Sequence, residues 1–566
     1  MKMNRRDFLR VAGVATAGGL LGPNNRAFAG KKSLTGARPN IILILADDMG
    51  YSDIASYGGE IQTPNLDRLA KNGLRFTQFY NGARCCPTRA ALLTGLYAHQ
   101  TGMGDMEPDW HFPGYRGNIN KQCVTLGQAL KANGYSTYMS GKWHLTNKWD
   151  HGKPEHKFNW PRQRGFDRYY GIIRGAADYY APKTLTRDNK NIEQEARDDP
   201  DYYLTDAISD SAAEFIAEHC KTRPAAPFFS YVAYTAPHWP LHARKRDVDK
   251  YEGKYMKGWD VLRKERHERM IRMGIVDAKW PLSERNASAV PWEGVDKAKV
   301  PERIQKALDK DTRGPKEIMA HKMAVYAAMI DSMDQGIGRI VSAVAKAGQL
   351  DNTLIVFLSD NGACAEYGVF GFGWILGNQY MKNGIPCGAR GSYTAYGPCW
   401  ANAGNTPFRY FKHFVHEGGI ATPLIVHWPA GIKAKGQLRH QVGHVIDIMP
   451  TFMEVAGAEY PKEYNGCRIK PMEGTSLVPA FDNKPIDREY ICWEHHGNRA
   501  IRIGKWKLVA RGERNPWELY DMEKDRTELN NLIEKKKDLA ARMEKTWHRW
   551  AKRCDVLPMN PNRKKK

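Results

Sequence analysis

The sequence predicts an α/β fold in which helices flank a central, mostly parallel sheet, with a smaller domain at the C-terminal end. Three runs of consecutive apolar residues, at positions 41–45, 354–358 and 423–426, are typical of strands buried on both faces. Helical patterns alternate with the strands, as they do in α/β folds. A chain of 566 residues, of which 42% are hydrophobic, can bury one large core and a smaller one.

The N-terminus has the features of an export signal at residues 1–29. Arg5 and Arg6 form a twin-arginine pattern, residues 11–21 are weakly apolar, and residues 27–29 (Ala-Phe-Ala) suit cleavage. We prefer this interpretation to a basic N-terminal helix. It predicts that the twin-arginine (Tat) export machinery is a partner and that the mature protein is periplasmic or extracellular.

The large domain is expected to span residues 36–459. Two more strands are predicted at 135–139 and 228–234, and helices at 63–73, 125–133, 206–219 and 316–347. The first of these helices begins with Thr63 as N-cap and Pro64 at the first helical position. Residues 244–316 are rich in charge, and the helical pattern at 251–273 predicts a solvated surface helix.

The smaller domain is expected at residues 460–556, where the sequence changes to short alternating segments. Residues 501–509 predict a hairpin of an antiparallel sheet, and a charged helix is predicted at about 532–549. This gives the second domain an α+β character. Residues 557–566, which end in four basic residues, form a basic tail.

The formal net charge of +23 suits either a nucleic acid or a polyanionic substrate such as a sulfated glycan. We recognise no nucleic-acid-binding motif and expect no such partner. No apolar run reaches the ~20 residues of a membrane span, so no stable membrane insertion is expected. The 10 cysteines are few, and Cys364, Cys387 and Cys399 are the best candidates for a disulfide.

The most informative motif is at Cys85, which is followed by Pro87, Arg89 and a short apolar helical segment that ends at Gly95. The offsets of two and four residues single out Cys85 and make Cys86 a bystander. Two buried thiols or a strained vicinal disulfide are the alternative explanation. A proline in the first turn indicates that a helix begins here, and its free N–H groups could hold an anion.

Acidic and amide side chains directly follow two of the buried strands. Asp47 and Asp48 come after the strand at 41–45, and Asp360 and Asn361 after the strand at 354–358. Ligands of α/β sheets bind at the carboxyl ends of the strands. Either pair alone could cap a helix, but four hard oxygen donors together predict a Ca²⁺ or Mg²⁺ site.

Four more polar groups follow the same positional rule. Lys142 and His144 come just after the strand at 135–139, and His238 just after the strand at 228–234. Lys412 lies shortly before the strand at 423–426. Each alone would most simply be structural or solvated, but four such groups near one sheet predict an active site.

These motifs resemble those of the type I sulfatases, in particular the arylsulfatase branch of the alkaline phosphatase superfamily. The similarity runs through residues 39–95, 141–144, 251–273, 323–329 and 405–429, whereas residues 363–405 match no family motif. It implies an alkaline phosphatase-like large domain with a central mixed, mostly parallel sheet. It also implies that a formylglycine-generating enzyme converts Cys85 to formylglycine (3-oxoalanine), a further partner of this chain.

The resemblance also implies roles for the site residues. Ca²⁺, rather than Mg²⁺, would be bound by Asp47, Asp48, Asp360, Asn361 and the formylglycine made from Cys85. Arg89 would fix the hydrated aldehyde, and Lys142 and Lys412 would neutralise the sulfate oxygens. His238 would protonate the leaving oxygen, and His144 would deprotonate the second hydroxyl of the hydrate so that sulfate is expelled.

The expected activity is hydrolysis of sulfate esters, with carbohydrate sulfates as the natural substrates. Two alternatives remain open: a phosphonate or phosphodiester hydrolase with the same modified cysteine, and an inactive secreted relative that retains an anion pocket. The sugar, the sulfated hydroxyl, exo or endo action and the oligomeric state stay open at this point.

Overall fold

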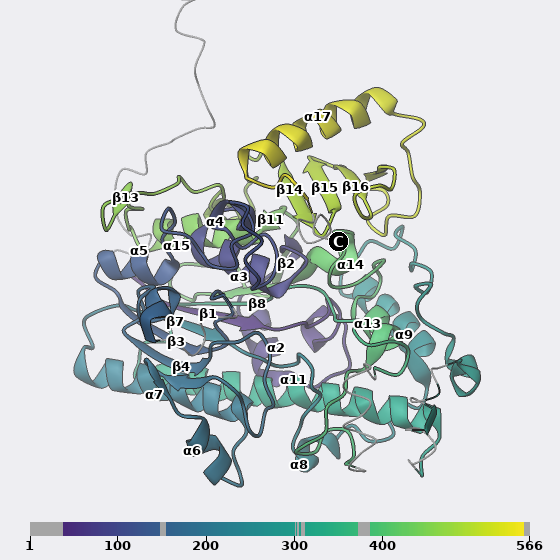
Figure 1. Cartoon of the computed structure of the whole chain (residues 1–566), viewed down its shortest axis with the longest axis horizontal. Coiled ribbons are helices and arrows are strands. Elements are labelled where there is room, and N and C mark those ends of the chain that lie inside the picture. The colour runs from purple at the N-terminus through teal and green to yellow at the C-terminus, as the bar shows by residue number, and fades with distance from the viewer. Residues whose placement is uncertain are drawn as a thin grey trace, which may run out of the picture.

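The computed structural model describes residues 38–147, 154–299, 302, 305–306, 312–371 and 385–559. The predicted signal at 1–29 and the tail from 560 lie outside these residues. Among them, every helix is too short or too polar to cross a membrane. Figure 1 shows a large central sheet between two layers of helices and a smaller sheet at the C-terminal end.

The large sheet has 11 strands in the order β10-β2-β9-β8-β1-β7-β3-β4-β5-β6, with β11 beside β2. Its strands are β1 (Asn40–Ala46), β2 (Leu74–Tyr80), β3 (Ser136–Gly141), β4 (Arg168–Ile172), β5 (Leu185–Arg187), β6 (Lys190–Asn191), β7 (Phe228–Ala233), β8 (Thr353–Ser359), β9 (Ala421–His427), β10 (Gln437–Arg439) and β11 (Gly443–His444). The five strands β8, β1, β7, β3 and β4 run parallel. The predicted α/β class with a mixed, mostly parallel sheet is confirmed.

Strand β1 is buried on both faces, as its apolar run predicts. Ile41, Leu43 and Leu45 belong to one core and Ile42 and Ile44 to the other. The first core contains residues of α3 (Cys85–Thr94), α5 (Leu126–Ala132) and α15 (Ile448–Val455). The second contains residues of α2 (Pro64–Lys71), α7 (Leu204–Thr222) and α11 (Pro315–Lys346), and the two layers are visible in Figure 1.

Strand β9 is the one predicted core strand that is not parallel to its neighbours. It pairs antiparallel with both β8 and β2, and the register against β2 shifts between Phe76 and Phe79. Pro423 lies opposite this irregularity, where its missing N–H does not interrupt a regular ladder. A proline inside a central strand is therefore accommodated by a bulge.

The remaining elements are short and lie mostly in connections. They are η1 (Ala55–Tyr57), α4 (Ala98–Thr101), η2 (Pro154–Asn159), α6 (Glu193–Asp198), α8 (Lys245–Val248), α9 (Gly258–Arg272), η3 (Trp292–Lys297), α13 (Gly397–Gly404), α14 (Glu417–Ile420), η4 (Val445–Asp447), β12 (Glu463–Tyr464), β13 (Cys467–Arg468) and α16 (Val478–Phe481). The helix predicted at 125–133 is confirmed as α5. At α5, Thr125 Oγ1 accepts the Gln128 N–H at 3.1 Å, as expected of an N-cap.

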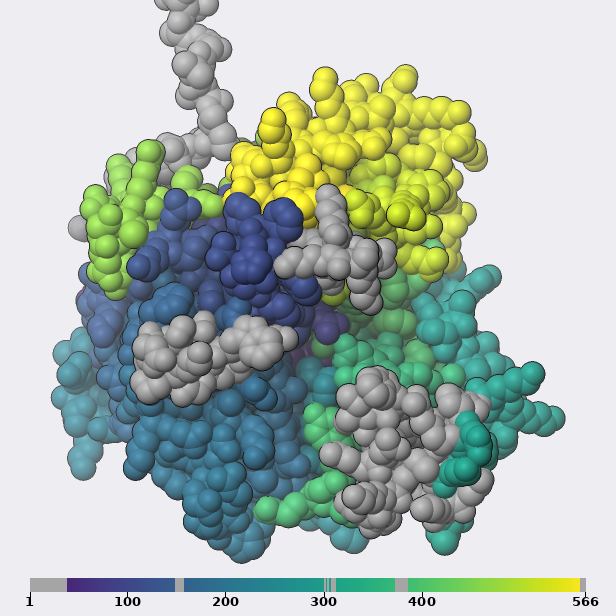
Figure 2. Space-filling model, in the orientation of Figure 1, coloured from purple at the N-terminus to yellow at the C-terminus, as the bar shows by residue number. Residues whose placement is uncertain are grey.

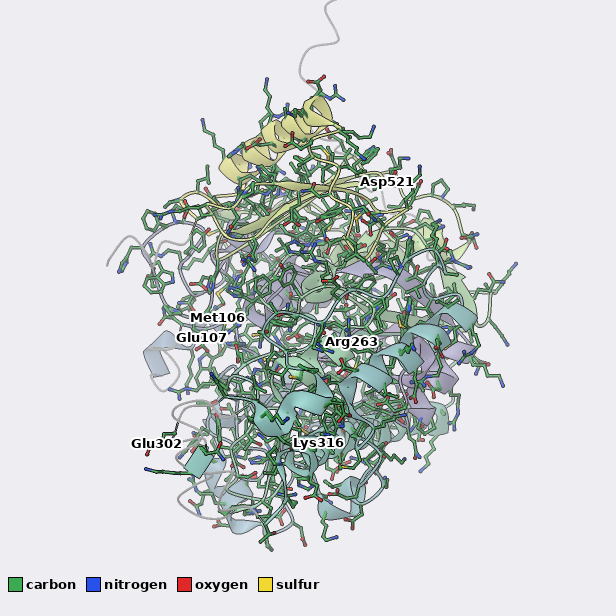
Figure 3. The ribbon with its side chains drawn as sticks, turned by 90° about the vertical axis from the view of Figure 1, so that its right-hand side faces the viewer. Met106, Glu107, Arg263, Glu302, Lys316 and Asp521 are labelled. Carbon is green, nitrogen blue, oxygen red and sulfur yellow. The ribbon has the colours of Figure 1, made fainter. Side chains whose placement is uncertain are left out.

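The C-terminal sheet is antiparallel and consists of β14 (Ile491–His495), β15 (Asn498–Ile503), β16 (Trp506–Ala510) and β17 (Glu518–Asp521). Figure 3 shows α17 (Lys537–Arg553) on its outer face. The predicted hairpin is confirmed as β15–β16. The predicted helix begins five residues late, because the Leu532 N–H bonds the Leu519 carbonyl at 2.8 Å and ties that segment to the sheet.

The solvated surface helix predicted at 251–273 is wrong for one face of α9. Trp259 and Arg266 on this helix are completely buried, and Arg263, which is labelled in Figure 3, is nearly so by its exposed surface. Arg266 binds Asp53 at 2.7 Å and Glu60 at 2.8 Å. A charged pattern looks solvated in sequence, but these arginines are buried because partners from distant segments satisfy them.

The disulfide expected among Cys364, Cys387 and Cys399 is also absent. All ten cysteines, each of which lies in the described part of the chain, are free. The Cys387 thiol instead lies 2.9 Å from Thr394 Oγ1. The three residues share a segment of sequence, but proximity in sequence does not supply the geometry of a disulfide.

A buried ionic network joins the C-terminal sheet to the main body, two regions whose contact is visible in Figure 2. Lys507 of β16 lies 2.9 Å from Glu417 and 2.8 Å from Glu528, and all three side chains have no exposed surface. Arg526 binds Glu417 as well, at 2.9 Å. Burial opposes the ionisation of Glu417, but Lys507 and Arg526 outweigh this and lower its pKa to about 2.

We predict that Lys507→Met lowers the free energy of unfolding by about 3–5 kcal/mol, because it leaves Glu417 and Glu528 buried with one cation fewer. Equilibrium urea unfolding measures the change. Lys505→Met is the matched control, since Lys505 lies in the same hairpin but is 38% exposed, and should change the value by less than about 1 kcal/mol. Equal small effects of both substitutions would contradict a structural role for the network.

Candidate active site

The site begins with the parallel pairing of β1 and β8, in which Ala46 lies opposite Ser359. The next residues of both strands therefore meet. The Asp48 N–H donates to Asp360 Oδ1 at 3.1 Å, and Asn361 Nδ2 donates to Asp48 Oδ1 at 2.7 Å. The structure thus brings together Asp47, Asp48, Asp360 and Asn361, which the sequence had placed at two separate strand ends.

Strand β3 brings Lys142 into the same place. Lys142 Nζ donates to Asp47 Oδ2 at 2.6 Å, and its backbone N–H to the Ala233 carbonyl at 2.7 Å. Gly141 makes this approach possible, because a Cβ there would lie 1.9 Å from the Ala233 oxygen and its φ is +116°. Glycine at the end of β3 therefore lets the lysine turn toward the aspartates.

His238 and Lys412 face Asp48 from two other segments. Lys412 Nζ donates to Asp48 Oδ2 at 2.7 Å, and His238 Nε2 lies 3.4 Å from the same oxygen. His238 Nδ1 lies 2.5 Å from the Trp239 carbonyl. Since a carbonyl can only accept, Nδ1 carries the proton, and Nε2 of the neutral ring is an acceptor directed to the acidic cluster.

Cys85 is the first residue of α3 and is buried beside His144, with a ring nitrogen of His144 within 4.8 Å of its Sγ. Arg84 before it is extended, so the first turn of α3 presents its N–H groups near residue 85. Gly175 packs against the His144 ring, and a Cβ there would lie 2.2 Å from Nε2. A hydrogen bond with Cys86, followed by Lys142 and His144, holds the pKa of Cys85 well below its usual value despite burial.

Arg89 occupies the predicted place one turn into α3 and contacts the acidic cluster. Its guanidinium donates to Asp360 Oδ2 at 2.9 and 3.2 Å and to the Lys142 carbonyl at 3.1 Å. It also lies 3.6 Å from Asp47. Arg89 therefore helps to orient the acidic cluster.

The charged side chains of the site are almost completely buried. Burial raises the pKa of Asp47, and Lys142 and Arg89 oppose this only in part. Burial, followed by repulsion from Asp47, raises the pKa of Asp360 to about 8. Asp48 differs, because the charge and the hydrogen bond of Lys412 outweigh burial and hold its pKa far below its usual value. Carboxylates crowded in this way attract a cation.

Two oxygens in this cluster fit a metal ion by an independent criterion. Asp47 Oδ1 and Asn361 Oδ1 are buried and have no hydrogen-bond partner among the described residues. Buried polar atoms are rarely left unsatisfied. Carboxylate and amide oxygens are also the donors that Ca²⁺ and Mg²⁺ prefer, so these residues fit the predicted divalent cation.

Two of the site residues have unusual backbone conformations. Asp48 has φ of 65° and His144 has φ of 58°, a left-handed region that non-glycine residues seldom adopt. Support for the loop after Asp48 comes from Asp53, which accepts the Gly50 N–H at 2.8 Å and bonds Tyr326 and Arg266. Such strain persists where surrounding contacts over-determine the chain.

A pocket of about 450 Å³ opens onto Cys85. Its lining includes His144, His238 and Lys412 and residues that the motifs did not indicate, namely Arg84, Met106, Glu107, Arg174, Gly175, Ala176, Trp239, Glu366 and Tyr367. Figure 3 labels Met106 and Glu107, which come from the segment after α4. Arg84 and Trp239 directly adjoin motif residues and could have been predicted from the sequence as pocket residues, whereas nothing local in the sequence marks Glu107 or Glu366.

Comparison with known proteins decides the family. The family described as Sulfatase matches residues 39–458, and the C-terminal region described for N-sulphoglucosamine sulphohydrolase matches residues 407–553. The chain belongs to the sulfatase family. It is 34% identical to an uncharacterised sulfatase of Schizosaccharomyces pombe over 91% of this chain and 94% of that protein. It is 32% identical to an arylsulfatase of Klebsiella aerogenes, over 78% and 91%.

Solved sulfatase structures have the same fold. Ps i-CgsB, crystallised with k-i-k-neocarrahexaose, aligns with a TM-score of 0.63 and 26% identity over 92% of this chain and 98% of that one. BT4656, in complex with its substrate D-glucosamine-2-N,6-O-disulfate, aligns with a TM-score of 0.58 and 24% identity over 92% and 99%. The alkaline phosphatase-like fold expected from the resemblance is confirmed.

The protein is therefore a sulfatase, an enzyme that hydrolyses sulfate esters, and its family uses a formylglycine and a divalent metal. Residues 2–22 match the twin-arginine translocation signal, which confirms the predicted export to the periplasm or beyond.

We predict that Ca²⁺ raises the melting temperature of the protein, because a ligand at a hundred times its Kd stabilises the native state by about 2.7 kcal/mol. Asp360→Asn should remove most of this Ca²⁺-dependent rise, and differential scanning fluorimetry with and without Ca²⁺ measures it. Asp482→Asn, at a 73% exposed aspartate, is the control and should retain the full rise. A rise of equal size in all three proteins would place the ion elsewhere.

Proposed function

We propose that this sulfatase removes sulfate from carbohydrate sulfate esters, using Ca²⁺ and a formylglycine formed from Cys85. The observation that carries the proposal is the convergence on Cys85 of three buried carboxylates, two lysines and two histidines from five separate segments of the sheet edge. An anionic tetrahedral substrate needs this surplus of directed donors, and a structural cluster does not.

The proposed substrate class rests on the relatives. An N-acetylglucosamine-6-O-sulfatase of Bacteroides thetaiotaomicron is 28% identical over 90% of this chain and 86% of that protein. The solved neighbour with a bound neocarrahexaose also carries a carbohydrate. Export places this enzyme where extracellular glycans are met. Together these observations support a sulfated sugar as the natural substrate.

The divalent cation and the formylglycine would each supply one part of the chemistry. A divalent cation held by Asp47, Asp48, Asp360 and Asn361 would lower the pKa of a neighbouring hydroxyl. A formylglycine at position 85 would supply, as its hydrate, one hydroxyl to attack sulfur and a second to expel sulfate.

The lysines bind and orient the sulfate. Each ammonium has three N–H donors and gives one to its aspartate, Lys142 to Asp47 and Lys412 to Asp48. The other donors would neutralise sulfate oxygens beside residue 85, with Lys412 near the leaving oxygen. Because Lys412 also lines the pocket, it bridges the metal ligands and the leaving group.

The histidines handle protons. A ring nitrogen of His144 lies within 4.8 Å of Cys85 Sγ, and His144 would accept the proton of the second hydroxyl at position 85. Its Nε2 lies 3.7 Å from Glu107 Oε1, a neighbour that would stabilise the imidazolium formed. His238 would protonate the leaving oxygen from Nε2, for which the ring must be cationic, since its Nδ1 proton is held by the Trp239 carbonyl.

Two partners follow from this proposal. A formylglycine-generating enzyme would oxidise Cys85 before the chain folds around it, because Cys85 is 1% exposed in the folded protein. The Tat machinery exports folded proteins, so modification and metal loading would both precede export.

The direct test is hydrolysis of 4-nitrophenyl sulfate and bis(4-nitrophenyl) phosphate by protein co-produced with a formylglycine-generating enzyme. We predict that the sulfate ester is hydrolysed much faster and that Cys85→Ala abolishes the reaction. A dominant phosphodiester rate would instead assign the chain to the phosphonate and phosphodiester hydrolases that share the modified cysteine. Absence of turnover with Cys85 modified would indicate an anion-binding relative.

Cys85→Ser separates the formylglycine account from simple nucleophilic catalysis. Serine has one hydroxyl, so attack on sulfur leaves a sulfate ester that has no neighbouring hydroxyl to expel it. We expect at most one turnover per molecule, seen as a burst of 4-nitrophenolate and as added SO₃ mass on the peptide. Continuous turnover by Cys85→Ser would contradict the account.

A further inference from the structure

Part of the pocket wall is made by residues that no motif of the chain explains. Glu366 is fixed there by both of its carboxylate oxygens: Oε1 accepts from Arg84 at 3.0 Å, and Oε2 accepts from the Trp239 indole N–H at 2.7 Å. The side chain nevertheless remains 26% exposed and lines the pocket. A substrate in the pocket therefore meets a carboxylate that cannot easily move away.

An aromatic surface adjoins this carboxylate. The Trp239 ring lies 4.7 Å from the His238 ring, makes an edge contact with Tyr367 at 5.1 Å and is tilted against Tyr393 at 5.8 Å, all measured between centroids. Because Trp239 directly follows His238, its ring is next to the predicted donor to the leaving oxygen. A sugar ring or an aryl ring can pack on such a surface.

The cations of the wall are already engaged. Lys412 pairs with Asp48 at 2.7 Å and Arg84 with Glu366 at 3.0 Å. Arg174 has interactions of its own. Glu107 adds a second carboxylate to the lining. A further anionic group on the leaving alcohol would thus approach two carboxylates and would have to displace an existing ion pair.

We propose that this wall selects leaving groups that carry no negative charge beside the scissile sulfate, with Glu366 as the specificity-determining residue. The inference rests on the proposed sulfate-ester hydrolysis and narrows its substrate class to singly sulfated, otherwise uncharged sugars or aryl alcohols. Repulsion between like charges at close range is an effective way to reject a wrong partner. The net charge of the chain, +23, would suggest the opposite preference.

The test compares three chromogenic esters with the mature enzyme: 4-nitrophenyl sulfate and its 3-carboxamide and 3-carboxylate derivatives. The carboxylate and the carboxamide are similar in shape and differ in charge. In the wild type, kcat/KM for the carboxylate ester should fall below that for the carboxamide ester by about ten-fold or more. Glu366→Gln keeps the shape of the side chain and the hydrogen bond to Trp239. It should bring the ratio of kcat/KM for the carboxylate ester to kcat/KM for the carboxamide ester close to the ratio of the uncatalysed hydrolysis rates of the two esters.

Glu195→Gln is the matched control, because it also neutralises an Arg–Glu pair, with Arg187, but on the exposed helix α6. The ratio of kcat/KM for the carboxylate ester to kcat/KM for the carboxamide ester should be the same in Glu195→Gln as in the wild type. The specificity inference would be overturned if Glu366→Gln left this ratio unchanged, or if Arg174→Gln selectively lost hydrolysis of the carboxylate ester. In either case, continued hydrolysis of 4-nitrophenyl sulfate would show that the sulfatase activity itself is intact. If none of the three esters were hydrolysed, the inference and the proposed function would both fail.

Discussion

The parallel pairing of β1 with β8 is the constraint on which the rest of the site depends. It aligns Ala46 with Ser359 and so forces Asp47-Asp48 and Asp360-Asn361 into one buried volume. Carboxylates so placed must be neutralised, and each cation of the site is found on one of them: Lys142 on Asp47, Lys412 on Asp48 and Arg89 on Asp360. The strand register thus determines where the positive charges of the candidate site lie.

The cluster is supported by contacts well outside it. The loop after Asp48 is held by Asp53, which is bonded in turn by Tyr326 of α11 and Arg266 of α9. The segment that carries Lys412 leads into Glu417, which is fixed by Lys507 and Arg526 from the C-terminal region. The smaller sheet therefore contributes to the order of the site through buried ion pairs, and these are costly to break.

Much of the fold and the clustering of the candidate site residues could be predicted because their signals are local. A run such as residues 41–45 identifies a buried strand, and whatever follows it lies at the ligand-binding edge. The offsets after Cys85 likewise identify a helix start. The prediction of a solvated helix failed because it depended on partners distant in sequence: one face of α9 is buried, since Arg266 pairs there with Asp53 and Glu60. Glu366 owes its place to Arg84 and Trp239, and no pattern in its own segment reveals that.

The central claim is that one buried cluster holds both a divalent metal and the modified Cys85. The most direct measurement is a crystal structure of the enzyme co-produced with its maturation enzyme and grown with Ca²⁺, with an anomalous difference map collected at long wavelength. The account predicts a peak bounded by Asp47, Asp48, Asp360 and Asn361, and density at position 85 that fits a hydrated aldehyde and lacks the sulfur of cysteine. A cation bound elsewhere, with an unaltered thiol at position 85 in an active enzyme, would contradict it.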